Sequence, residues 1–143
     1  MAKGIVVPIR SEPPHSIFFK KPSFEYTGYG TTPCFCGYSG RWFYSSEEAV
    51  RRGCEELEKM FDGDEIEGPQ MVNYNDLYLK WNIETTSFGA ANKWDPSSRY
   101  SRRPNFVFSW CGPGTELYDK CNEPVFLVEP AYDALPEYYY LED

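Results

Sequence analysis

The clearest pattern of apolar and polar positions lies between Ser45 and Phe61. Four apolar residues follow one another there at helical intervals and form one stripe: Val50, Cys54, Leu57 and Phe61. Ser45 and Glu48 have the spacing of a capping box, and Gly63 can end the helix. The pattern therefore predicts one principal helix over about residues 46–61.

Short apolar runs on both sides of this helix predict strands. Before the helix they occupy residues 4–9, 16–20, 34–38 and 41–44. After it they occupy residues 77–84, 105–110 and 124–129. Ser39-Gly40 suits a hairpin turn, residues 77–84 alternate between apolar and polar, and residues 86–104 predict a long polar connection. The expected fold is α+β, a mainly antiparallel sheet with the helix packed on it.

Length and composition suit a single domain. The chain has 143 residues, near the commonest domain size, and its 41% hydrophobic content is too high for a disordered protein. We expect one domain over residues 1–143, with an acidic, aromatic C-terminal tail from about residue 130. No apolar run is long enough for a membrane span, and the first residues lack the apolar segment of a signal peptide. The odd number of cysteines, five, predicts reduced thiols and an intracellular location, in the cytoplasm or a host cytoplasm.

Charge is unevenly distributed along the chain, whose net charge is −8. Residues 55–67 hold seven acidic residues against Lys59 alone, and the C-terminal tail is also acidic. Acidic side chains attract basic surfaces, and tyrosine is favoured in interfaces. We therefore predict that a partner protein with a basic surface is bound by the acidic loop and the tail, through Asp62, Asp64, Glu65, Glu67, Tyr138, Tyr139 and Tyr140.

A basic, aromatic segment at residues 93–103 supports a different hypothesis. Arginine binds phosphate, and aromatic rings stack on bases. The candidate contacts for a phosphate, a nucleotide or nucleic acid are Lys93, Trp94, Arg99, Arg102 and Arg103. Loop solvation and ion pairs with the chain's own acidic segments are the simpler interpretation of these residues.

No sequence motif indicates catalysis or a bound cofactor. Phosphate-binding glycine loops and nucleophile motifs are absent, and His15 is the one histidine. A zinc site is an alternative that would need four cysteines to meet, although their spacing is unlike that of common zinc sites: Cys34, Cys36, Cys111 and Cys121. We predict no catalytic residue, no metal and no cofactor.

Three functions follow from these patterns. The leading hypothesis is a non-enzymatic, inhibitor-like protein that covers a basic, nucleic-acid-binding surface of its partner. In length, acidity and aromatic content, the chain resembles in general character the small accessory proteins with which viruses and phages block a host factor. The first alternative is a structural accessory subunit of a larger assembly. The second is a ligand-binding protein or small enzyme that uses residues 93–103.

Overall fold

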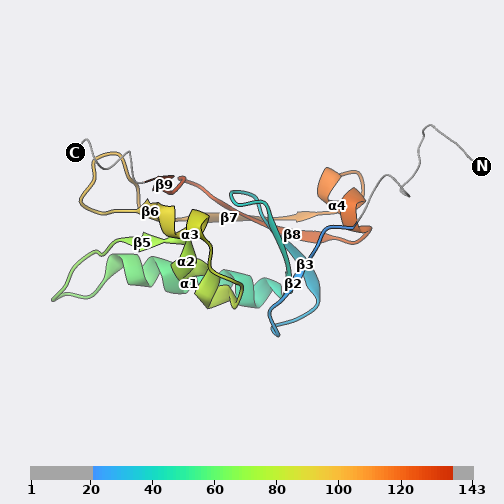
Figure 1. Ribbon diagram of the computed structural model, residues 1–143, viewed down its shortest axis with the longest axis horizontal. Helices are drawn as coiled ribbons and strands as arrows, with labels where there is room; N and C mark the ends of the chain where they lie inside the picture. The colour runs from blue at the N-terminus through green and yellow to red at the C-terminus, as the bar shows by residue number, and fades with distance from the viewer. Residues whose placement is uncertain (1–20, 137–143) are drawn as a thin grey trace, which may run out of the picture.

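The structure of the chain is a computed structural model that describes residues 21–136. The predicted strands at 4–9 and 16–20, His15 and the last part of the tail lie outside these residues. Figure 1 shows the elements in chain order, with these bounds: β2 (Glu25–Tyr26), β3 (Thr32–Cys36), β4 (Arg41–Ser45), α1 (Glu47–Asp62), β5 (Val72–Asn73), α2 (Tyr74–Trp81), α3 (Ser87–Ala91), β6 (Asn92–Trp94), β7 (Phe106–Cys111), α4 (Glu116–Cys121), β8 (Val125–Pro130) and β9 (Leu135–Pro136).

The fold is α+β, as the sequence predicted, and its main sheet is mixed. Five strands follow the order β2-β4-β3-β8-β7, and a smaller sheet has the order β5-β6-β9. The β3–β4 hairpin and the β7–β8 pair are antiparallel. The β2–β4 and β3–β8 pairs are parallel. The prediction of a mainly antiparallel sheet is therefore only partly right.

The predicted helix is confirmed as α1, with a different N-cap. Ser46 is the N-cap, and its hydroxyl accepts a hydrogen bond from the Ala49 N–H at 3.1 Å. Ser45 is instead the last residue of β4, where it pairs with Thr32. The predicted apolar stripe is buried against the sheet, and Gly63 follows the last helical residue.

The predicted strand at residues 77–84 is wrong, because this segment begins within helix α2. Asn73 and Asp76 form a capping box at its start, and Asn82 ends it in the left-handed conformation. Four side chains at helical spacing are buried: Tyr74, Leu77, Tyr78 and Trp81. The polar connection predicted over 86–104 likewise contains α3 and β6.

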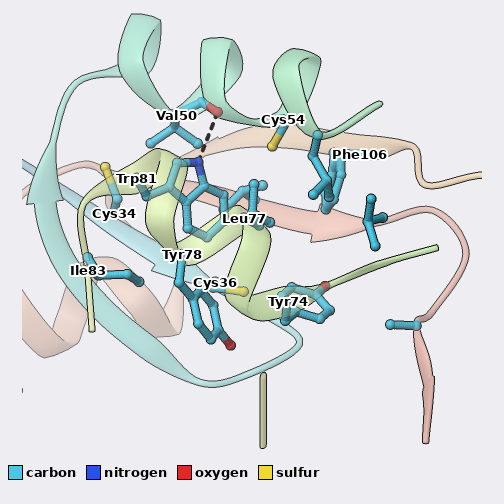
Figure 2. Close-up of a cluster of buried hydrophobic side chains, with 14 of the residues drawn as sticks. Cys34, Cys36, Val50, Cys54, Tyr74, Leu77, Tyr78, Trp81, Ile83 and Phe106 are labelled. Atoms are coloured by element: carbon cyan, nitrogen blue, oxygen red, sulfur yellow. Dashed lines mark hydrogen bonds between the residues drawn. The ribbon is translucent and has the colours of Figure 1, made fainter. Parts of the chain in front are cut away.

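The core lies between the main sheet and helices α1 and α2. Figure 1 shows these two helices on one side of β7 and β8, and α4 on the other side. Figure 2 shows the Trp81 ring beneath α1, where its Nε1–H donates to the Val50 carbonyl at 3.1 Å. Trp81 also stacks on Phe43 of β4, with 5.2 Å between ring centroids. One side chain therefore joins α2, α1 and the sheet.

No helix among the described residues has both the length and the apolar character needed to cross a membrane.

Gly53 on α1 provides the space that Trp81 occupies. A Cβ atom at position 53 would lie 2.6 Å from Cδ1 of Trp81. Glycine-to-alanine changes inside helices usually stabilise a protein, by roughly 0.5–1 kcal/mol. We expect the opposite for Gly53→Ala, a loss of about 1–3 kcal/mol in the free energy of unfolding, because the core would be overpacked. Denaturant unfolding measures this change, and a stabilised variant would contradict the packing of Trp81 on α1.

Candidate functional site

The loop that follows α1 has a conformation fixed by its own hydrogen bonds. We call residues 62–70 the acidic loop. The Asp64 carboxylate accepts hydrogen bonds from the N–H groups of Ile66 and Glu67, at 2.9 and 2.7 Å. The Gly68 N–H donates to the Asp64 carbonyl, and the Gln70 N–H donates to the Phe61 carbonyl. Figure 1 shows the loop projecting beyond the end of α1.

Gly63 at the start of the acidic loop cannot be replaced without moving the backbone. Its φ of 68° is unfavourable for other residues, although its ψ of −161° lies outside the left-handed helical region. A Cβ atom at this position would overlap the Gly68 carbonyl. Gly63 and Gly68 are therefore in close contact where the loop begins and ends. The prediction that the helix ends at Gly63 is confirmed.

The four predicted acidic contacts have different roles in the structure. Asp62 forms an ion pair with Arg103 at 2.7 Å, and a hydrogen bond from this guanidinium lowers the pKa of Asp62. Asp64 bonds the loop backbone, and Glu67 accepts a hydrogen bond from the Gln70 side chain. Glu65 is exposed and makes no hydrogen bond or ion pair with residues 21–136.

Ile66, at the tip of the acidic loop, is a candidate contact that sequence reasoning missed. Its side chain is 94% exposed, the highest value among the large hydrophobic residues that the structure describes. Met60 and Met71 are also exposed and line a hollow of about 280 Å³ at the base of the loop. The only sequence signal is an isoleucine between two glutamates. An apolar centre with a charged rim is the usual composition of a protein interface.

The predicted basic set at 93–103 does not form one exposed surface. Trp94 is fully buried, and its Nε1–H donates to the Tyr132 carbonyl at 2.9 Å. Trp94 is therefore a core residue, which corrects its assignment as a ring that stacks on bases. Arg103 pairs with Asp62 and with Glu58, at 2.7 and 3.2 Å.

Two other basic residues of this segment, Arg99 and Arg102, contact aromatic rings. Arg102 lies over the Tyr132 ring, 5.2 Å from its centroid. Arg99 lies beside Tyr100 and donates to its hydroxyl at 2.9 Å. Lys93 is half-buried on β6. Arg99 and Arg102 thus lie against tyrosine rings, whereas Arg103 pairs with two acidic residues of α1. The predicted contacts Tyr138, Tyr139 and Tyr140 lie outside the described residues.

The five cysteines are unpaired thiols, and burial raises the pKa of each of them. For Cys34 the pKa rises to about 12. A thiol with a raised pKa is neutral near pH 7, and the thiolate is the form that attacks electrophiles and binds metals. Within residues 21–136, no three cysteine, histidine or acidic side chains are placed to hold a metal ion together. The arrangement supports cysteines that act as small apolar core residues.

The exposure of each thiol predicts its reactivity. We expect Cys111 to be labelled first by a thiol reagent, because it is the one cysteine that is only half-buried. Cys34, Cys36 and Cys54 should react only when the protein unfolds, because both burial and a raised pKa protect them. Mass spectrometry of labelled peptides measures the order, with the unfolded chain as the control. Rapid labelling of these three residues in the native protein would contradict the described core.

The four predicted acidic residues thus lie on the acidic loop together with Ile66, and the basic set includes one buried ring, Trp94. Comparison of the chain with protein-family models, with curated proteins and with solved structures found no match.

Proposed function

We propose that this chain is a non-enzymatic, inhibitor-like binding protein that covers a basic surface of a partner protein with its acidic loop. The observation that supports the proposal best is the exposure of Ile66 on a loop whose conformation is fixed by its own hydrogen bonds. Burial of an exposed apolar side chain by a partner is favourable, and an ordered loop loses little conformational entropy on binding. Ile66 would supply the apolar anchor of the contact.

Charge determines the kind of partner that we propose. Glu65 and Glu67 lie on either side of Ile66, and Asp64 is exposed beside them. These carboxylates repel nucleic acid and attract a basic protein surface. We propose that this surface is one with which the partner itself binds nucleic acid, in the manner of small acidic inhibitors of viruses and phages. The buried, unpaired thiols favour action inside cells, where thiols stay reduced.

The two alternatives differ in the contact that they require. An accessory subunit of an assembly needs a larger and more apolar interface than a single loop tip. A phosphate or nucleotide site at residues 93–103 would have to form without Trp94, because Trp94 is buried. Its ligand would also have to compete with Glu58 and Asp62 for Arg103. The acidic loop therefore remains the better-supported site.

Affinity capture from a cell lysate by the full chain tests the proposal. We expect a basic protein to be retained by the native chain and lost with the double variant Glu65→Lys, Ile66→Ala. Glu84→Lys and Leu79→Ala are matched controls, since Glu84 is exposed after α2 and Leu79 is 66% exposed on α2. These two changes should leave capture intact. Equal capture by the loop variant and the native chain would contradict the proposal.

A further inference from the structure

Among residues 21–136, strand β7 is an edge of the main sheet. It pairs with β8 on one side, and it is the last strand in the order β2-β4-β3-β8-β7. None of its remaining backbone groups bonds to another group within residues 21–136. An open edge of this kind is a template on which a further strand can pair.

The hydrogen bonds of neighbouring residues define which backbone groups face outward. The Ala131 N–H donates to the Asn105 carbonyl, and the Gly37 N–H donates to the Val128 carbonyl. Since bonding alternates along an antiparallel pair, residue 105 bonds to Ala131 and residues 107, 109 and 111 bond to β8. The N–H and C=O groups of the other three residues therefore point away from the sheet: Phe106, Phe108 and Trp110.

The edge lacks the features that usually keep an edge strand unpaired. Proteins protect such strands with charged residues, prolines or bulges. β7 reads Phe-Val-Phe-Ser-Trp-Cys, without charge, proline or glycine, and its residues favour extended structure. Val107 and Trp110 are 52% and 51% exposed. A strand added here would bury apolar surface on both faces and bond to three residues of β7.

Helix α1 places an acidic ridge beside this edge. Arg51 lies over the Phe108 ring, 4.5 Å from its centroid, and Glu58 and Asp62 pair with Arg103 just before β7. The same side of α1 also carries Glu47 and Glu55, at helical spacing from Arg51. We define the acidic ridge as Glu47, Glu55, Glu58 and Asp62. Glu47 pairs with Arg51, and Glu58 and Asp62 pair with Arg103, so the ridge carries more carboxylates than the guanidinium groups that pair with it.

We propose that β7 binds an extended, basic segment of a partner protein as an additional strand. Alternate side chains of such a strand point to the α1 side of the sheet, where lysine or arginine would meet the acidic ridge. A second copy of this chain is disfavoured as the occupant, because pairing of two β7 strands would bring two acidic ridges together. The inference goes beyond the proposed function, since it concerns the edge of β7 and not Glu65 and Ile66, although Asp62 belongs to both the acidic loop and the acidic ridge.

Short synthetic peptides test this inference on the full chain. The probe alternates lysine with threonine, and its controls are the glutamate–threonine peptide and the lysine peptide with N-methylated backbone. We expect the lysine peptide to bind at least about tenfold more tightly than either control. Amide exchange should slow at Phe106, Phe108 and Trp110 and stay unchanged at Val107 and Ser109. Equal binding of the three peptides, or protection without this alternation, would overturn the inference.

Matched variants at one position separate the backbone from the side chain. Trp110→Pro removes an outward N–H and leaves the hydrogen bonds between β7 and β8 in place, whereas Trp110→Ala retains that N–H. We expect the proline variant to lose about tenfold in affinity relative to the alanine variant. Equal affinities of the two folded variants for the peptide would overturn the inference. Self-association of the chain that protects the same three amides from exchange in the absence of peptide would also overturn it. The N-methylated peptide supplies the same test if the proline variant does not fold.

Discussion

Replacement of Trp81 with alanine is expected to lower the free energy of unfolding by about 3–5 kcal/mol. The Trp81 side chain is fully buried, stacks on Phe43, fills the space above Gly53 and donates to the Val50 carbonyl. Alanine would leave a cavity where α1, α2 and the sheet meet, and nearby side chains fill such cavities only in part. Loss of the Trp81 side chain should therefore strongly destabilise the fold.

Denaturant unfolding of Trp81→Ala and Leu79→Ala measures this effect. Leu79 lies on the same helix and is largely exposed, so its replacement should change the free energy of unfolding by less than about 0.5 kcal/mol. The contrast also tests the helical assignment of residues 74–81, because a strand over 77–84 would place both side chains on one face. Similar losses for the two variants would contradict α2.

Leu57→Ala is expected to cost about 2–5 kcal/mol. Leu57 lies in the middle of the apolar stripe of α1, is fully buried, and belongs to the core that joins the helix to the sheet. Met60 is partly exposed on the same helix, and Met60→Ala should cost much less. Thermal or denaturant melting compares the two. A loss below about 0.5 kcal/mol for Leu57→Ala would mean that another face of α1 is buried.

Elements with a strong local pattern could be predicted from the sequence. The stripe of α1 repeats over several turns, and the strands at 105–110 and 124–129 are continuous apolar runs that correspond to β7 and β8. The hairpin around Ser39-Gly40 is also confirmed as β3–β4, with the Gly40 N–H donating to the Cys36 carbonyl. Each of these signals depends on residues that are close in the sequence.

Helix α2 shows why short apolar runs are ambiguous. Leu77, Leu79 and Trp81 alternate as in a strand, but Leu77, Tyr78 and Trp81 also fit one face of a helix. The capping residues Asn73 and Asp76 lie before the run, outside the segment whose alternation predicts a strand. Packing of Trp81 against α1 then favours the helix, and that contact is between residues far apart in the sequence.

The candidate site could be predicted in its charge but not in its geometry. The acidic character of residues 62–67 is plain from composition. The ion pair of Asp62 with Arg103 joins residues 41 positions apart, so no local pattern indicates it. The position of β7 at an edge likewise follows from the parallel β3–β8 pairing, which is a tertiary contact. These contacts determine which charges remain for a partner.

The rate of association with the captured partner tests the central claim most directly. Exposed charges are screened over about 8 Å at physiological ionic strength, so added salt should slow association about tenfold or more, whereas dissociation should change less. Glu65→Lys should slow association further, and Ile66→Ala should speed dissociation, because an apolar anchor acts only at contact. Glu84→Lys and Leu79→Ala should behave like the native chain. An association rate that changes neither with salt nor with Glu65→Lys would contradict the claim that the acidic loop guides binding to a basic partner.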